Sequence, residues 1–198
     1  MPGGPLHSLI NGQQAEHISI RDRGFQYGDG CFETVRILSN KPILWAAHFK
    51  RLEHACETLH LSVNFNLLQS EMAQLLLANK ATDVILKITI TRGEGGRGYA
   101  PTAQSDCTPI LQLIDYIAPA TNNGARVVVC QHRLSSNSLL GGIKHLNRLD
   151  QVLASMQIPE NCDEGLCMDE GGYVIEACRS NLLLAIDNQL VAPDLSKS

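Results

Sequence analysis

The spacing of apolar residues changes sharply within the first third of the chain. From Cys31 to Leu38 apolar and polar side chains partly alternate, which is typical of a β-strand with one buried face. Further on, the apolar residues step by three and four positions, which places them on one face of a helix. They are Trp45, Phe49, Leu52, Cys56 and Leu59. The chain therefore combines sheet and helix, and we expect an α+β fold.

The same criteria predict the other elements of the first 118 residues. We expect a strand over 17–20, a short hairpin partner over 43–45 and a second helix over 67–80 that starts near Asn66. Two more strands are expected over 83–92 and 108–117. The loop that joins them reads RGEGGRGY, from Arg92 to Tyr99.

The segment 118–125, APATNNGA, is the best candidate for a linker, because it is rich in turn-forming residues and lacks apolar periodicity. After it we expect a strand over 126–130, a polar loop over 133–138 and a helix in the second half of 139–156. Residues 163–193 predict four strands, with turns at Gly171-Gly172 and Asp187-Asn188. Two domains follow, a small one over 1–118 and the first part of a larger one over 119–198.

Composition narrows the class of protein. The 198 residues are 44% hydrophobic and 18% charged with a net charge of −4, which indicates a globular chain and argues against a general nucleic-acid or anionic-membrane surface. There is no membrane-spanning apolar run and no secretory signal at the start, so a cytoplasmic protein is expected.

The cysteines and histidines do not predict a metal site. The seven cysteines are scattered, and Cys162 and Cys167 lie close without a second pair or a histidine to complete a zinc pattern, which favours free thiols in a reducing cytosol. His48, His54 and His60 do not share one helix face at the i, i+4 spacing of a metal pair.

The glycine loop contains a G-x-G-x-x-G pattern at Gly93, Gly95 and Gly98. In a dinucleotide fold this pattern opens a helix whose N-terminus holds the pyrophosphate. Here a strand is expected to follow, so the pattern indicates a hairpin loop instead. Glycines alone would make a flexible loop, whereas Arg92, Arg97 and Tyr99 suit recognition of carboxylates.

Three further residues suggest cofactor chemistry. Lys144, in GGIKHLNRL, has apolar and glycine neighbours that would desolvate its amine and lower its pKa, although an exposed lysine is the simpler interpretation. Glu176 ends an apolar strand and would pair with a protonated ring nitrogen, or is simply solvated. Arg51 beside the apolar helix stripe would grip a phosphate, or snorkel to solvent. Together they match the needs of pyridoxal phosphate (PLP).

At this point the chain resembles the fold-type IV PLP enzymes, which include branched-chain and D-amino acid aminotransferases and aminodeoxychorismate lyases. The likeness runs essentially from end to end through DRGFQYGDGCFETVR, HFKRL, RGEGGRGY, GGIKHLNRLDQVLA and GYVIEACRSNLLL. GIKHLNRL and RGEGGRGY are most specifically similar to the lyases. The resemblance implies the two-domain fold-type IV architecture, a homodimer and no metal.

The resemblance also implies roles for individual residues. Lys144 matches the lysine that forms a Schiff base with PLP, and Glu176 matches the acid at the pyridine nitrogen. Arg51 matches the phosphate-binding arginine, and Ser180 and Asn181 fall in the segment along the cofactor.

The substrate implied by the resemblance is aminodeoxychorismate, which has two carboxylates. Charge complementarity assigns one of these carboxylates to Arg97, with Tyr99 beside it. Arg92 is a further candidate, and Tyr27 borders the substrate. The implied reaction yields 4-aminobenzoate and pyruvate.

Two alternatives stay open from the sequence. One is a D-amino acid or branched-chain aminotransferase, although the tyrosine that follows the lysine in branched-chain enzymes is replaced here by the neighbourhood of Asn147, Arg148 and Leu149. The other is an inactive PLP-binding relative. Members of the family continue beyond the position of Ser198 with a glycine-rich phosphate-binding turn, so the large domain is expected to be truncated at its C-terminus.

Overall fold

The computed structural model describes residues 7–80, 82–101, 106–118 and 124–193. By its contacts the chain divides into two compact units. Unit 1 comprises Met1–Ala118 together with Ile143–Leu146, and unit 2 comprises Pro119–Gly142 together with Asn147–Ser198. The short segment that contains Lys144 is thus packed with unit 1.

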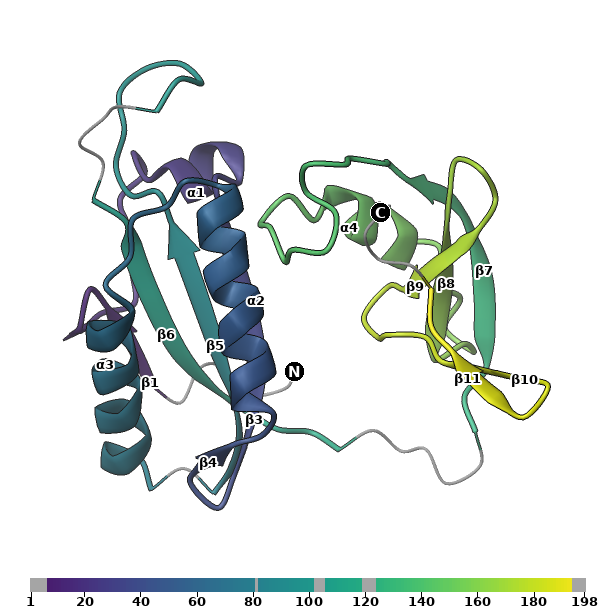
Figure 1. Cartoon of the computed structure of the whole chain (residues 1–198), viewed down its shortest axis with the longest axis horizontal. Coiled ribbons are helices and arrows are strands. Elements are labelled where there is room, and N and C mark those ends of the chain that lie inside the picture. Colours follow the sequence, from purple (N-terminus) through teal and green to yellow (C-terminus); the bar gives the residue numbers. More distant parts are fainter. Residues whose placement is uncertain (1–6, 81, 102–105, 119–123, 194–198) are drawn as a thin grey trace. The chain divides into compact units, whose positions relative to one another are not determined.

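Unit 1 is built on a six-stranded antiparallel sheet in the order β2-β1-β6-β5-β3-β4 (Figure 1). Its strands are β1 (His7–Ile10), β2 (Gln13–Gln14), β3 (Gly30–Leu38), β4 (Lys41–Pro42), β5 (Asp83–Thr91) and β6 (Thr108–Asp115). The long strands β5 and β6 are direct neighbours, so the glycine loop between them is a hairpin connection, as the sequence predicted.

One face of this sheet forms the core of unit 1. Val35 of β3 lies opposite Leu86 of β5, which in turn lies opposite Leu113 of β6, and all three are fully buried. Alternate residues of β3 and β5 face the other way and are only half-buried or exposed. This alternation matches the pattern from which the strands were predicted.

Two helices run alongside the sheet of unit 1 (Figure 1). They are α2 (Trp45–Thr58) and α3 (Phe65–Ala78). The predicted stripe of α2 turns inward at Leu52 and Cys56, which are 1% exposed. Helix α3 begins earlier than predicted, because the side chain of Asn64 accepts a hydrogen bond from the backbone N–H of Leu67 and so caps the first turn.

Two short strands predicted in unit 1 were wrong. Residues 17–20 form no strand, and the edge of the sheet is made instead by β1 and β2. The hairpin partner of β3 is Lys41–Pro42 rather than 43–45, because Ser39 and Asn40 already adopt the positive φ angles of a tight turn. The turn thus ends two residues earlier than the apolar residues suggested.

A short helix, α1 (Arg23–Tyr27), is fixed to the end of β5 by a buried aspartate. Asp22 is 2% exposed. Its Oδ1 accepts a hydrogen bond from the N–H of Gly24 (2.8 Å), and its Oδ2 accepts one from the hydroxyl of Thr91 (2.7 Å). The Thr91 hydroxyl also accepts a bond from the N–H of Gly93 (3.0 Å). Asp22 therefore joins α1 to the first glycine of the hairpin loop.

Unit 2 contains a three-stranded sheet in the order β7-β8-β9 and a separate hairpin. Its elements are β7 (Val127–Leu134), α4 (Leu149–Ser155), β8 (Glu164–Asp169), β9 (Val174–Ala177), β10 (Leu184–Ile186) and β11 (Gln189–Val191). Strands β7 and β8 are parallel, and α4 lies on the connection between them. Asp187 and Asn188, both with positive φ, form the predicted turn between β10 and β11.

The α+β character expected from the sequence is confirmed in both units. Strand β7 continues through residues 133 and 134, where a polar loop was predicted. All seven cysteines are free thiols. Within the described residues no helix combines the length and apolar character that crossing a bilayer requires.

We predict that Asp22→Ala lowers the free energy of unfolding of unit 1 by about 3 kcal/mol, because it removes two buried hydrogen bonds, one of which caps α1. Trp45 is the only tryptophan of the chain and lies in unit 1, so its fluorescence during urea unfolding reports on this unit. Asp115→Ala, at an exposed strand end, is the matched control and should change the value by less than about 0.5 kcal/mol. Equal effects of the two substitutions would contradict the structural role of Asp22.

Candidate active site

The segment that carries Lys144 is held against β3 by backbone hydrogen bonds. The N–H of Phe32 donates to the carbonyl of Lys144 (2.8 Å), and the N–H of Leu146 donates to the carbonyl of Gly30 (2.9 Å). Lys144 is half-buried, and its Nζ lies 5.2 Å from the centre of the Phe32 ring. The amine is therefore placed over the aromatic face of Phe32.

On the core side of β3, Glu33 forms a buried ion-pair cluster with helix α2. Its carboxylate is 1% exposed and accepts hydrogen bonds from Nε of Arg51 (2.5 Å), Nη2 of Arg51 (2.8 Å) and Nδ1 of His48 (2.8 Å). Burial alone would raise the pKa of Glu33, but the bonds from Arg51 and His48 hold that pKa below its usual value.

Arg51 is therefore fixed in place by its partner. The bonds to Glu33 raise the pKa of Arg51 and bind two of its three guanidinium nitrogens. About a third of its side chain (35%) remains exposed. The structure thus presents a permanently charged, oriented guanidinium on α2, rather than a loosely snorkelling arginine.

A partly buried carboxylate, that of Asp29, binds two arginines between α1 and β3. Its Oδ2 accepts from Nε of Arg23 and from Nε of Arg92, both at 2.8 Å. Although burial opposes ionisation, these arginines lower the pKa of Asp29. Arg92 also donates to the carbonyls of Leu59 and His60. Its guanidinium is thus engaged within the protein, and only 13% of its side chain is exposed.

Arg23 fixes the far side of the glycine loop. This arginine is 3% exposed, and it donates from Nη1 to the carbonyl of Gly98 (3.1 Å) and from Nη2 to the carbonyl of Tyr99 (2.6 Å). A methyl group on Gly95 would lie 2.5 Å from Cδ of Arg23, so the loop can close over this arginine only with glycine there. The loop is a shaped structure, and its glycines allow its backbone to contact a buried cation.

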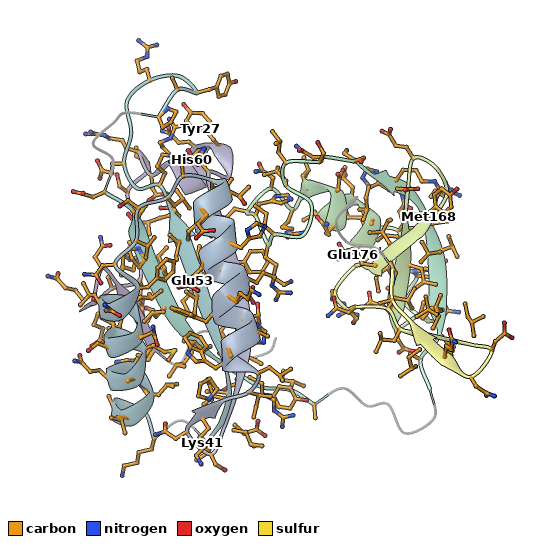
Figure 2. The ribbon with its side chains drawn as sticks, in the orientation of Figure 1. Tyr27, Lys41, Glu53, His60, Met168 and Glu176 are labelled. Atoms are coloured by element: carbon orange, nitrogen blue, oxygen red, sulfur yellow. The ribbon has the colours of Figure 1, made fainter. Side chains whose placement is uncertain are left out.

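The loop and α1 enclose an open hollow of about 460 Å³. Its lining includes Tyr27, Arg97, Arg21 and Gln26. The ring of Tyr99 packs edge-on against Tyr27, with 5.4 Å between ring centres. Figure 2 shows Tyr27 at the same end of unit 1 as His60. The predicted residues Tyr27, Arg97 and Tyr99 are therefore brought together.

Arg97 differs from Arg23 and Arg92, whose guanidinium groups are bound to Asp29. It is exposed, and among the described residues no acidic side chain pairs with it. Arg21, in contrast, is 3.4 Å from Glu94 in a surface ion pair. The hollow therefore offers one unneutralised guanidinium, a phenol and an amide, which is a donor set suited to a carboxylate.

In unit 2, Glu176 lies on β9 (Figure 2) and is half-buried. Its Oε1 accepts a hydrogen bond from Nε2 of Gln151 on α4 (3.1 Å). The other end of that amide, Oε1 of Gln151, is buried without a partner among the described residues. Glu176 is therefore oriented by α4 and is not a freely solvated strand end.

The remaining predicted cofactor residues lie just after β9. The hydroxyl of Ser180 donates to Glu164 (2.9 Å), and the carbonyl of Ser180 accepts from the N–H of Ala177 (2.9 Å). Asn181 is exposed. These contacts hold the turn after β9 against β8 and leave the amide of Asn181 accessible.

Four residues that orient the predicted site were missed in the sequence. Arg23, Asp29 and Glu33 read in the sequence as ordinary polar positions, and Gln151 stands in a helix where glutamine is common. The alternation of β3 did offer a signal for Glu33, since it occupies a position of the buried face between Cys31 and Val35. A charge at such a position requires a partner.

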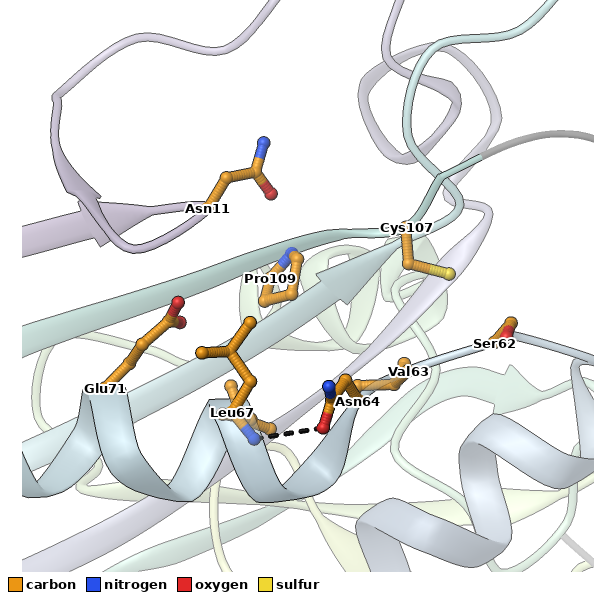
Figure 3. Close-up of a pocket in the computed structure, with 9 residues that line it drawn as sticks. Asn11, Ser62, Val63, Asn64, Leu67, Glu71, Cys107 and Pro109 are labelled. Atoms are coloured by element: carbon orange, nitrogen blue, oxygen red, sulfur yellow. Dashed lines mark hydrogen bonds between the residues drawn. The ribbon is translucent and has the colours of Figure 1, made fainter.

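A second hollow, of about 210 Å³, lies in unit 1 at the N-terminal end of α3. Figure 3 shows Glu71 and Leu67 of α3 facing Asn11 and Pro109 across it. Burial raises the pKa of Glu71. None of the residues predicted to bind cofactor or substrate lines this hollow, so it is separate from the candidate site.

Comparison with known proteins gives one family. The family model described as amino-transferase class IV matches residues 30–198. The aminodeoxychorismate lyase of Vibrio harveyi is 33% identical over 197 residues, which cover 96% of this chain and 71% of the relative.

Solved structures agree with this result. The crystal structure of 4-amino-4-deoxychorismate lyase from Pseudomonas aeruginosa is 40% identical with a TM-score of 0.89, and the match covers 96% of this chain and 71% of that structure. The branched-chain amino acid aminotransferase from Escherichia coli has a TM-score of 0.82 at 20% identity, which shows likeness of fold alone. That match covers 98% of this chain and 68% of the aminotransferase.

We predict that the Glu33 cluster makes unit 1 lose stability in acid. Because the pKa of Glu33 is lower in the folded chain than its usual 4.5, its contribution is complete above that value and is lost as the pH falls through the folded-state pKa. In urea unfolding followed by Trp45 fluorescence, the urea concentration at the midpoint should decrease as the pH is lowered below about 5. Glu33→Gln should be about 2 kcal/mol less stable at neutral pH and show a shallower acid slope.

Asp83→Asn is the matched control for that experiment, because Asp83 forms an exposed ion pair with Arg36. Its acid slope should equal that of the wild type. Asp29 also has a lowered pKa, so a residual slope in Glu33→Gln is expected. An unchanged slope in Glu33→Gln would show that Glu33 is not the titrating group.

Proposed function

Because the chain belongs to the class IV aminotransferase family and has the α+β fold of the fold-type IV enzymes, we propose that it is a PLP-dependent lyase. It would convert 4-amino-4-deoxychorismate to 4-aminobenzoate and pyruvate. The observation that carries this choice is the hollow beside the glycine loop, where Arg97 and Tyr27 offer donors to a carboxylate. The likeness to two lyases at 33% and 40% identity supports it.

The chain carries the residue types that binding of PLP requires. Lys144 offers a half-buried amine, and Glu176 offers a carboxylate held by Gln151. The side-chain amide of Gln151, which donates to Glu176, also carries the buried oxygen without a partner among the described residues. This oxygen can still accept a hydrogen bond. Arg51 offers an oriented, partly exposed guanidinium of the kind that binds phosphate.

When bound, PLP supplies an electron sink that stabilises negative charge at the substrate carbon next to its amine. The amine of Lys144 holds the cofactor and is then released to act as a base, removing the proton from that ring carbon. As an ammonium it returns a proton to the departing enolpyruvyl group. All atoms of the substrate are divided between 4-aminobenzoate and pyruvate, so the reaction needs no second substrate.

The remaining cofactor residues have supporting roles in this proposal. Glu176 keeps a proton on the pyridine nitrogen, and Gln151 fixes the direction of its carboxylate. Arg51 binds the phosphate, and Ser180 and Asn181 lie along the cofactor. The contacts of Ser180 with β8 support a fixed position for that turn.

For the substrate carboxylates we propose Arg97 as the charged contact, with Tyr27 and Tyr99 forming the adjacent wall. Arg92 is proposed to act indirectly, since its guanidinium is bound to Asp29 and to backbone carbonyls. We further propose a homodimer in the cytosol, where the seven free thiols would stay reduced.

The proposed reaction is tested by incubating the protein with PLP and aminodeoxychorismate without any oxo acid. We expect 4-aminobenzoate and pyruvate in equal amounts. Lys144→Ala should lose at least about a thousandfold in kcat and the visible absorbance of covalently bound PLP. Lys41→Ala, an exposed lysine on β4, is the matched control and should keep both.

Other outcomes of the same assay separate the alternatives. Product that forms from an amino acid only when an oxo acid is added would indicate an aminotransferase and reject the lyase. Bound PLP without turnover of either kind would indicate an inactive relative. Visible absorbance that persists in Lys144→Ala would reject the assigned lysine.

A separate prediction concerns Arg97. Arg97→Ala should raise KM for the dicarboxylate substrate at least about tenfold with little change in kcat, because it removes a charge-assisted contact made with the bound substrate. The absorbance of bound PLP should be unaffected. Arg126→Ala, an exposed arginine of unit 2, serves as the control. Loss of PLP absorbance in Arg97→Ala would place the loop against the cofactor instead of the substrate.

A further inference from the structure

Three cysteines converge in the core of unit 2 from three different parts of the sheet. Cys130 lies on β7, Cys167 lies on β8 and Cys178 directly follows β9. Their sulfur atoms all lie within 4.8 Å of one another. The sulfur of Cys178 is 3.8 Å from that of Cys130 and 3.5 Å from that of Cys167. All three side chains are buried, with exposed fractions of 1%, 0% and 9% in sequence order.

We propose that Cys130, Cys167 and Cys178 form a binding site for a soft metal ion of low coordination number, monovalent copper. This site is independent of the proposed lyase activity. In the sequence Cys167 lies nearest to Cys162, but Cys162 is half-buried and stands outside the group.

The sulfur positions need little adjustment to hold such an ion. An ion about 2.3 Å from each sulfur requires sulfurs about 3.8 Å apart in tetrahedral geometry and about 4.0 Å apart in trigonal geometry. The separations of 3.8 and 3.5 Å from Cys178 lie within about 0.5 Å of these values, and the separation of Cys130 from Cys167 is at most 4.8 Å. The ligands come from three segments, so their arrangement exists only in the folded unit.

The number of ligands selects the metal. Among the described residues, only these three cysteines belong to the group, with no histidine or carboxylate as a fourth ligand. Structural zinc requires four ligands, whereas thiolate sulfur favours copper(I), which accepts three. The surrounding side chains of Leu134, Ala154 and Ile175 are buried and apolar, so they exclude the water that would complete a zinc site.

The backbone beside the sulfurs is kept open by Gly165. A methyl group there would lie 2.6 Å from the sulfur of Cys130 and 2.9 Å from that of Cys178. Burial raises the pKa of the Cys130 and Cys167 thiols, so without a metal these thiols stay protonated and unreactive. Copper would displace their protons on binding.

The first experiment uses the wild-type chain under reducing, oxygen-free conditions. Copper(I) is supplied from the chelator bicinchoninate, and we expect one equivalent to be transferred to the protein. X-ray absorption at the copper edge should show a shell of sulfur atoms only. Zinc(II) tested in parallel should bind at least tenfold more weakly. Failure to take copper, a shell of nitrogen or oxygen, or tighter binding of zinc would each overturn the proposal.

Variants locate the site. Cys167→Ser and Cys178→Ser should each weaken copper binding more than roughly a hundredfold, because each removes a direct ligand. Loss of a residue that only orients a ligand costs up to about a hundredfold. Cys162→Ser is the control within unit 2. Cys56→Ser is the control for a buried thiol, because its sulfur lies 3.8 Å from that of Cys31 and, among the described residues, it belongs to no group of three potential ligands. Both controls should bind one equivalent as the wild type does.

Circular dichroism of each variant establishes that unit 2 is folded, and the absorption spectrum of the wild type tests the ligands even where a variant does not fold. Copper binding that persists unchanged in a folded Cys167→Ser variant, or that disappears in Cys56→Ser, would overturn the assignment.

Discussion

Asp29 holds together the part of unit 1 on which the candidate substrate site depends. Its carboxylate binds Arg23 and Arg92, and each arginine carries the contact onward to a different segment. Arg92 reaches the carbonyls at the end of α2, and Arg23 reaches the backbone of the glycine loop. An isolated buried carboxylate would be costly, whereas one shared by two guanidinium groups stays ionised and fixes both. The position of the loop follows from this pairing.

The arginines near the candidate site thus divide into those that are bound within the protein and those that remain available to a ligand. Arg23 and Arg92 use their donors on Asp29 and on carbonyls, while Arg97 is exposed at the rim of the hollow. Arg51 stands between the two classes, since Glu33 orients it without enclosing it. A charged group that is fixed before a ligand arrives loses little freedom on binding, which favours both affinity and selectivity.

Periodicity predicted the long strands, both long helices and the paired turn at Asp187-Asn188, because these elements are decided by local spacing and turn chemistry. It failed at residues 17–20, whose apolar alternation is not matched by a partner strand. The candidate residues were found because a lysine, an acid and arginines stand in recognisable motifs. Their orienting partners, such as Asp29 and Gln151, were missed because each contact spans many residues and depends on the folded sheet.

The packing of Ile143–Leu146 with unit 1 has a consequence for how such a chain can be divided or recombined. The chain passes between the two units after residues 118, 142 and 146, so no single cut separates them. A fragment that ends at 118 would leave the start of β3 without its hydrogen bonds to the Lys144 segment, and one that begins at 119 would carry Lys144 without the ring of Phe32. If two relatives exchanged the second halves of their chains, the lysine segment of one protein would pack against the β3 strand of the other. The lysine and the strand that receives it are therefore expected to change together.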